Sequence, residues 1–384
     1  MKFFPDSLSK KLQERIQTVS LRVLPDPSNA IDFSSNDYLG FAKNESLFED
    51  VHQFLVDRFL KQNGATGSRL LSGNHTLYPE TENYIAEFHQ AEAALIFNSG
   101  YDANIGFFSA VPQRNDIVLF DELCHASIRD GIQMGLAQSF KFKHNDFSDL
   151  KRLLQKFKNQ KQQADSQIYV VTESVFSMDG DRPKLPELIA LTQEYHALVV
   201  IDEAHAVGVM GPKGVGSIQE HDLQDLVFAR IVTFGKALGV HGAAILGSNS
   251  LKHYLVNFAR SFIYTTGLSP HAVASIYLAY QKLKVSSSER EALFENIRCF
   301  QEKVLELFGL QQPHSPIQSI IIPGNERVKW VASQLQQLGF DVKPILSPTV
   351  PKGAERLRFC LHSYNTREEI KGVLHQLKTL QQSI

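Results

Sequence analysis

Short apolar runs alternate with longer helix-like stretches through the middle of the chain. Seven such runs, each ending in polar or small residues, cover 93–100, 116–122, 139–146, 167–175, 197–205, 229–236 and 243–249. Continuous runs rich in Val and Ile are typical of strands that are buried on both faces. The alternation therefore predicts an α/β domain with a seven-stranded, mostly parallel sheet and helices on both sides.

The pattern changes after about residue 270. Two helical segments, 269–284 and 288–309, precede strand candidates at 315–323, 340–346 and 356–363. A final amphipathic helix over 366–382 carries Ile370, Val373, Leu374 and Leu377 on one face. This order predicts a smaller α+β C-terminal domain.

The N-terminal segment has apolar residues at helical spacing, namely Leu8, Leu12, Ile16 and Val19. We expect an amphipathic helix here that docks on the body of the protein. The expected division of the chain is therefore an N-terminal helix and arm over 1–37, a large domain over 38–270 and a C-terminal domain over 271–384.

Composition narrows the class of protein. With 384 residues, of which 43% are hydrophobic and 21% charged, the chain is typical of a soluble globular protein with a large core. The net charge of −2 gives no field that attracts polyanions, so we expect no nucleic acid as partner. The three cysteines are far apart, which predicts neither disulfides nor a metal site and favours the cytoplasm. We find neither a membrane-spanning run nor the continuous apolar stretch of a signal peptide.

The segment "VVIDEAHAVG" (199–208) contains the four letters DEAH, which name a family of helicases. A helicase needs a Gly-rich phosphate loop that ends in Gly-Lys-Ser or Gly-Lys-Thr. The nearest match, "FGKALG" (234–239), lacks both the first glycine and the hydroxyl that would hold magnesium. The helicase interpretation is excluded, and a nucleotide-binding module without enzymatic activity is weakened for the same reason.

Polar residues follow the apolar runs: Ser99, Gly100 and Tyr101, then His125, the segment 173–177, Asp202 and His205, and Thr233 and Lys236. Because ligands bind beyond the carboxyl ends of strands in open parallel sheets, these residues indicate one site. Taken singly, Asp202 is also compatible with a structural salt bridge, Lys236 with a surface lysine and His125 with a loop histidine. Together they suit a ligand with a phosphate, a protonated ring nitrogen, a flat ring and an aldehyde, which are the features of pyridoxal 5'-phosphate (PLP).

Motifs along nearly the whole chain carry a family resemblance. They include "NDYLG" (36–40), "FNSGYDAN" (97–104), "DELCHASIRDG" (121–131), "TESVFSMDGD" (172–181), "VIDEAHAVGVMGPKGVG" (200–216), "TFGKALG" (233–239), "ARSFIYTTGLSP" (259–270) and "SPTVPKGAERLR" (347–358). The sequence resembles the α-oxoamine synthases, PLP-dependent enzymes of fold type I, the aspartate aminotransferase-like fold. Within the family, "TFGKALGVHGAA" and "PTVPKGAERLR" most resemble the members that act in biotin biosynthesis.

The resemblance implies roles for individual residues. Lys236 would bond the aldehyde of PLP and later move the substrate proton, Asp202 would pair with the ring nitrogen, and His125 would stack on the ring. His205 and Ser177 would lie near the phenolic oxygen of the cofactor. The phosphate would be held by Ser99, Gly100, Tyr101 and Thr233 of the same subunit and by Thr266 of the neighbouring subunit. Substrate contacts would come from Asn36 and Arg358, which would bind the amino-acid carboxylate, from Ser68, and from Arg22, which would contact the acyl group.

The implied reaction is a decarboxylative condensation of an amino acid with an acyl thioester. Ser68 stands where the 5-aminolevulinate synthases, which use glycine, have threonine. The missing methyl leaves room for a methyl on the substrate, which favours L-alanine by about 1–3 kcal/mol. The expected acyl donor is pimeloyl-CoA or pimeloyl-acyl carrier protein, and the expected assembly is a homodimer with shared active sites.

Other members of the family are the alternatives, with acetyl, succinyl or long-chain acyl donors, as in aminoketobutyrate ligases and in sphingoid-base or autoinducer synthases. A catalytically silent subunit of a heteromeric synthase is disfavoured, because Lys236, Asp202 and His125 are all present. Two features depart from the family. The segment between Arg22 and Asn36 is too short for the β-hairpin that relatives often carry. His241 replaces a common serine, where it would either touch the cofactor or fill an interface, and we favour the interface.

Overall fold

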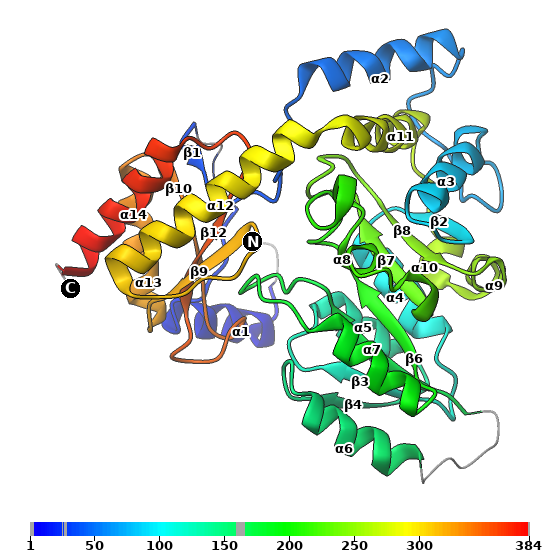
Figure 1. Ribbon diagram of the computed structural model, residues 1–384, viewed down its shortest axis with the longest axis horizontal. Coiled ribbons are helices and arrows are strands. Elements are labelled where there is room, and N and C mark those ends of the chain that lie inside the picture. The colour runs from blue at the N-terminus through cyan, green and yellow to red at the C-terminus, as the bar shows by residue number, and fades with distance from the viewer. Residues whose placement is uncertain (1–3, 25, 27–28, 159–165, 383–384) are drawn as a thin grey trace. The chain divides into compact units, whose positions relative to one another are not determined.

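The computed structural model describes residues 4–24, 26, 29–158 and 166–382 (Figure 1). The polar segment 158–167, expected to be a surface loop, and the short segment between Arg22 and Asn36 lie partly outside these residues. The chain divides into two compact units: a large unit of residues 36–177 and 181–291, and a small unit of residues 1–35, 178–180 and 292–384.

A seven-stranded sheet forms the centre of the large unit, as the sequence predicts. Its strands are β2 (Ala93–Phe97), β3 (Ile117–Asp121), β4 (Gln138–Phe142), β5 (Ile168–Glu173), β6 (Leu198–Asp202), β7 (Ala229–Thr233) and β8 (Ala243–Gly247). They lie in the order β2-β8-β7-β6-β5-β3-β4. Strand β8 is antiparallel to both of its neighbours, and the pairs from β7 to β4 are parallel.

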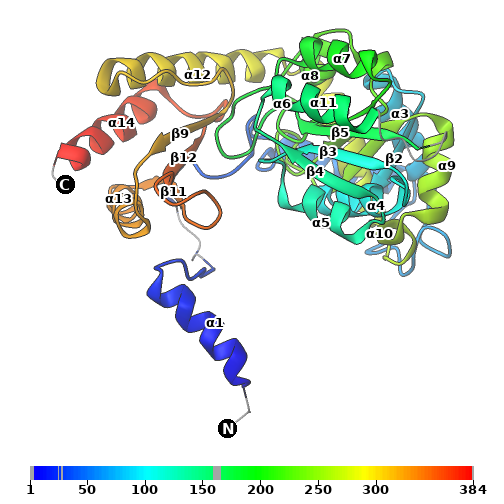
Figure 2. The same ribbon diagram turned by 90° about the horizontal axis from the view of Figure 1, so that it is seen from below.

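Helices of the large unit cover both faces of this sheet (Figure 2). The helices of this unit are α2 (Glu45–Asp57), which packs on α11, and α3 (Leu77–Phe88), α4 (Gly100–Ala110), α5 (Ala126–Met134), α6 (Phe147–Lys158), α7 (Leu185–Glu194), α8 (Ser217–Glu220), α9 (Asn249–Phe258), α10 (Arg260–Ile263) and α11 (Pro270–Val285), with short 3₁₀ turns at Pro212–Gly214 and Gln224–Leu226. In β5, Tyr169 and Val171 belong to the core cluster with α4, α5 and α9, whereas Ile168 and Val170 belong to the cluster with α6 and α7. Because successive side chains of a strand point to opposite faces, burial on both faces requires the continuous apolar runs.

The small unit is built around a three-stranded antiparallel sheet in the order β11 (Lys343–Ile345), β12 (Arg356–Cys360) and β9 (Ile317–Ile321). A separate parallel pair joins β1 (Ile31–Asp32) to β10 (Phe340–Asp341). Helices α13 (Asn325–Gln337) and α14 (Arg367–Gln382) complete the unit, and α12 (Ser287–Phe308) begins in the large unit and continues into the small one. Helix α14 buries the predicted face of Ile370, Val373, Leu374 and Leu377.

The observed division differs from the expected one at the end of the large unit and at the N-terminus, and residues 178–180 also belong to the small unit. Helix α11 belongs to the large unit, because Tyr277 packs against Phe54 of α2 and Tyr84 of α3, with ring centroids 5.7 and 5.2 Å apart. Residues 1–35 belong to the small unit, because β1 pairs with β10 there.

The N-terminal helix forms but does not dock as expected. Helix α1 (Asp6–Gln17) has no buried residue, and Leu8, Leu12 and Ile16 remain 44%, 48% and 58% exposed. The expectation of a docked helix is therefore wrong for the single chain. Helical spacing defines an apolar face but does not identify a surface that covers it.

An ionic cluster fixes the loop that follows β5. His144, just after β4, lies 2.9 Å from Asp121 at the end of β3 through Nδ1 and 2.7 Å from Asp181 through Nε2. Burial opposes the positive charge, but the two carboxylates outweigh it and raise the pKa of His144 to about 10. The imidazolium therefore holds the segment around Asp181 against the sheet edge.

This cluster predicts a pH-dependent stability. The pKa of His144 is raised from 6.5 to about 10, so the stabilisation is fully present below about pH 6.5 and is lost as the pH rises through 10. We expect His144→Gln to lower the free energy of unfolding by about 3 kcal/mol at pH 6.5, because Asp121 stays buried without its cation. Urea unfolding at several pH values measures this, with His253→Gln, on the exposed side of α9, as control. A loss of equal size at pH 6.5 and above pH 10 would contradict the assignment.

Candidate active site

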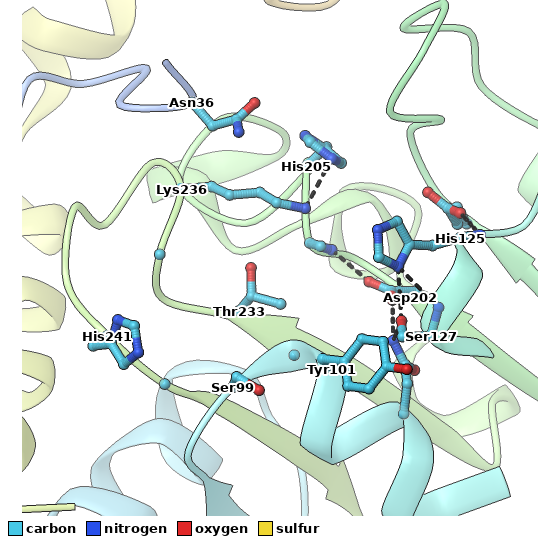
Figure 3. Close-up of a pocket in the computed structure, with 16 residues that line it drawn as sticks. Asn36, Ser99, Tyr101, His125, Ser127, Asp202, His205, Thr233, Lys236 and His241 are labelled. Atoms are coloured by element: carbon cyan, nitrogen blue, oxygen red, sulfur yellow. Dashed lines mark hydrogen bonds between the residues drawn. The ribbon is translucent and has the colours of Figure 1, made fainter. Parts of the chain in front are cut away.

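A cavity of about 260 Å³ lies at the carboxyl edge of the large sheet. It is lined by nine of the candidate residues: Asn36, Ser99, Gly100, Tyr101, His125, Asp202, His205, Thr233 and Lys236 (Figure 3). They come from separate segments of the chain that each follow a strand or, for Asn36, precede the large unit's first helix. Parallel strands bring their carboxyl ends to one edge, which explains why distant motifs meet here.

Lys236 extends across this cavity toward His205, with 2.8 Å between Nζ and Nε2. His205 is nearly completely buried, and its Nδ1 lies 2.7 Å from the hydroxyl of Tyr38. That hydroxyl donates to Oδ1 of Asn36, so it accepts the Nδ1 proton of His205. Nε2 of His205 then carries a lone pair and accepts a hydrogen bond from Nζ of Lys236. The arrangement gives Lys236 a defined direction within the cavity.

Asp202 and Glu173 end adjacent strands as register partners, and both are buried. Asp202 accepts hydrogen bonds from the backbone N–H of Ala204 at 2.9 Å and from Nδ2 of Asn104 at 3.0 Å. Glu173 accepts from the backbone N–H of His125 at 2.6 Å. Burial first, and then the charge of Asp202, raise the pKa of Glu173 to about 8. Near neutral pH Glu173 therefore holds a proton.

Helix α4 points its N-terminus at the cavity. Ser99 is its N-cap, and the Ser99 hydroxyl accepts from the backbone N–H of Asp102 at 3.0 Å. A Cβ atom on Gly100 would lie 2.6 Å from Cγ2 of Thr233, so only glycine fits between the helix and β7. The buried Oγ1 of Thr233 has no hydrogen-bond partner among the described residues. An unpaired hydroxyl beside a helix N-terminus, next to a glycine that allows close approach, fits an anionic group such as a phosphate.

Five candidates do not line this cavity. Ser177 is partly buried in the loop after β5, Ser68 lies in the loop before α3, and Thr266 is exposed after α10. Arg358 lies on β12 and Arg22 precedes β1, both in the small unit. His241, expected to fill an interface, lines the cavity.

Three polar residues of the site were not in the predicted set: Tyr38, Asn104 and Ser127. Asn104 offered a signal, because it lies on the same face of α4 as the buried Phe107 and Phe108. A polar side chain at a core position of an apolar helix indicates a specific hydrogen-bond partner. Among the described residues, no group of three or more His, Cys, Asp or Glu side chains is placed to hold a metal ion.

Comparison with known proteins identifies the family. Residues 28–377 match the family model of class I and II aminotransferases, and the chain belongs to this family. Within it, the protein is a PLP-dependent acyltransferase of fold type I. The 8-amino-7-oxononanoate synthase of Emericella nidulans is 38% identical over 396 aligned residues, which cover 97% of this chain and 95% of the relative.

Solved structures agree with this family. Serine palmitoyltransferase from S. paucimobilis, with PLP and myriocin bound, has a TM-score of 0.88 at 25% identity and covers 98% of this chain and 97% of its own. The 8-amino-7-oxononanoate synthase of Francisella tularensis has a TM-score of 0.78 at 26% identity, with 92% and 98% coverage. Among the helices that the structure describes, none is both long and apolar enough to cross a membrane.

The α4 cradle generates a prediction about cofactor binding. Gly100→Ala places a methyl group against Thr233 at the helix N-terminus, so we expect PLP affinity to fall by about tenfold or more while the protein stays folded. Absorbance titration of the cofactor-free protein with PLP measures the affinity, and circular dichroism checks the fold. Gly64→Ala is the control, because a Cβ there meets nothing within 4 Å. Unchanged affinity in Gly100→Ala would remove Gly100 from the phosphate site.

Proposed function

We propose that the protein condenses L-alanine with a pimeloyl thioester, carried by CoA or acyl carrier protein, to give 8-amino-7-oxononanoate, CO2 and free thiol. One observation carries this proposal: Lys236, His205, Asp202 and His125 converge on one cavity in a chain that is 38% identical to a synthase with that product in its name. The substrates follow from the relative's name and from Ser68, whose small side chain leaves room for the methyl of alanine.

Lys236 is proposed as the residue that bonds the cofactor and moves the proton at the substrate Cα. A bound PLP supplies an aldehyde for the amino group and an electron-withdrawing ring that accepts the electron pair left at Cα. Asp202 would face the ring nitrogen, and the buried carboxylate is fixed for this purpose by Ala204 and Asn104. His205 would keep Nζ of Lys236 directed into the cavity when the amine is free.

The other candidate residues have supporting roles in the proposal. Backbone N–H groups of Ser99, Gly100 and Tyr101, with the hydroxyl of Thr233, would hold the phosphate. His125 would lie against the ring, and Ser177 would approach its phenolic oxygen. Asn36 and Arg358 would bind the carboxylate of the amino acid, and Arg22 the acyl substrate.

The active assembly is proposed to be a homodimer that shares its sites. The loop that carries Ser68 and the loop that carries Thr266 are joined by a hydrogen bond from Gly267 to Gly67. Apolar side chains on these loops are exposed in the single chain, with Leu71 at 85% and Tyr264 at 72%. A second copy that covers this face would bury them and place Thr266 near the phosphate of the neighbouring site.

The substrate assignment is tested by crossing acyl donors with amino acids. Thiol release and product mass are measured with pimeloyl-CoA, pimeloyl-acyl carrier protein, acetyl-CoA and palmitoyl-CoA, each with alanine, glycine or serine. We expect turnover with pimeloyl donors and alanine, and a product mass equal to both substrates less the thiol and CO2. Lys236→Ala should lower kcat by about 10³-fold or more. Turnover restricted to palmitoyl-CoA and serine would favour the activity of the serine palmitoyltransferase neighbour instead.

The shared site is tested by complementation between two impaired variants, at a PLP concentration too low to saturate Thr266→Ala. In analytical ultracentrifugation we expect the native protein to have twice the chain mass of 43.2 kDa. We expect Thr266→Ala to bind PLP at least tenfold more weakly than the native protein. Mixing Lys236→Ala with Thr266→Ala chains should restore activity, because half of the sites in a mixed dimer carry neither substitution. Ser275→Ala, on α11, is the control for PLP binding. A monomer, or an unchanged PLP affinity in Thr266→Ala, would contradict the shared site.

A further inference from the structure

A chain of hydrogen bonds connects His125, which is exposed at the cavity, to the buried Asp202 through two buried residues without an assigned role. The hydroxyl of Ser127 lies 2.7 Å from Nδ1 of His125, and Nδ2 of Asn104 lies 3.0 Å from that hydroxyl. The same Nδ2 lies 3.0 Å from Oδ2 of Asp202. Ser127 and Asn104 are 1% and 2% exposed, so water does not compete for these groups.

The direction of the first bond is fixed at the histidine end. The backbone N–H of Ser127 donates to Nδ1 of His125 at 3.2 Å, because His125 caps the N-terminus of α5. An N–H group can only donate, so Nδ1 carries a lone pair and no proton. The Ser127 hydroxyl, at 2.7 Å from the same nitrogen, must then donate as well.

The direction is fixed independently at the aspartate end. A carboxylate can only accept, so the atom of Asn104 that faces Asp202 is the amide nitrogen. Its second hydrogen goes to the Ser127 oxygen, whose own hydrogen is already given to His125. This orientation leaves Oδ1 of Asn104 buried and without a hydrogen-bond partner among the described residues, which costs free energy of folding.

We propose that Ser127 and Asn104 are positioning residues that hold His125 as the neutral tautomer with its proton on Nε2 and link that tautomer to Asp202. The proposal rests on the proposed function of the site, because it concerns the ring that would lie against the cofactor. Protonation of His125 at Nδ1 would break both bonds from Ser127. The link to Asp202 through Asn104 holds the serine hydroxyl in its donating orientation.

The charges and the burial around His125 also favour its neutral form. Burial lowers the pKa of the imidazole, and the nearby Lys236 and Arg129 lower it further, against the charges of Asp202 and Asp130. A neutral imidazole suits a neighbour whose ring nitrogen is protonated, because two stacked cations would repel each other. The hydrogen-bond chain therefore keeps positive charge on the cofactor side of the contact.

The tautomer is read directly by ¹⁵N NMR of the histidine side chains in the holoenzyme, with His125→Asn used to assign the signal. Because the pKa of His125 is lowered from its ordinary value, we expect a single neutral Nε2–H form from about pH 6.5 to 9 in the native protein. Ser127→Ala should mix the two tautomers or let the ring titrate within this range. Asn104→Leu should do the same, because the serine hydroxyl becomes free to rotate. Ser109→Ala, whose hydroxyl on α4 bonds only the carbonyl of Ile105 in the described structure, is the control and should leave the signal unchanged.

Kinetics provide a second readout. We expect Ser127→Ala to lower kcat by about five- to tenfold with little change in KM, together with a shifted acidic limb of the pH–rate profile. A native His125 that carries its proton on Nδ1, or a Ser127→Ala variant with an unchanged tautomer and pH profile, would overturn the proposal. The NMR result does not depend on the substrate, so it stands apart from a failure of the alanine and pimeloyl assignment.

Discussion

Burial of the parallel sheet on both faces is the constraint on which the site depends. Within β5 and β6, residues 168–171 and 199–201 are buried against one helical layer or the other, so a charged side chain has no place before the strand ends. The first carboxylates, Glu173 and Asp202, occupy the last positions of these strands. Since the strands are parallel, the same constraint in each of them concentrates polar groups at one edge.

Two buried carboxylates side by side are costly unless they differ in protonation. Glu173 takes the proton near neutral pH, because burial and its neighbour Asp202 raise its pKa to about 8. Asp202 has both oxygens on fixed donors, Ala204 and Asn104. The raised pKa of Glu173 thus reduces the repulsion between the two neighbouring groups, and the two hydrogen bonds hold Asp202 in one orientation.

The sequence predicted the fold well because apolar runs report burial directly. Six of the seven strands of the large sheet lie within the predicted runs, β4 begins one residue before its run, and α14 buries the four predicted residues. The cavity residues were found because the family motifs and the strand ends coincide. Asn104 and Ser127 were missed, since a polar residue inside a helix ordinarily indicates a solvent-exposed face. Only the tertiary structure shows that Asn104 points at Asp202.

The predictions made from hydrophobic spacing were wrong where the structure depends on which other surface covers a segment. The spacing of Leu8, Leu12 and Ile16 correctly indicated a helix, but nothing in that spacing states what covers its apolar face. The predicted end of the large unit, near residue 270, is wrong for a related reason. Tyr277 makes aromatic contacts with α2 and α3, which lie about 190 to 220 residues earlier in the sequence. A local sequence window does not include contacts over such a separation.

The chemistry and the specificity of the proposed reaction have different structural origins. Lys236, Asp202 and His125, the residues proposed for the chemistry, line one cavity within the large unit of a single chain. Ser68, which is proposed to favour alanine over glycine, instead lies on a loop bonded to the loop of Thr266 and does not line the cavity. If a second copy brings both loops to its neighbour's cavity, substrate choice becomes a property of the dimer. Relatives with other substrates can then share the catalytic cavity and differ at the loops.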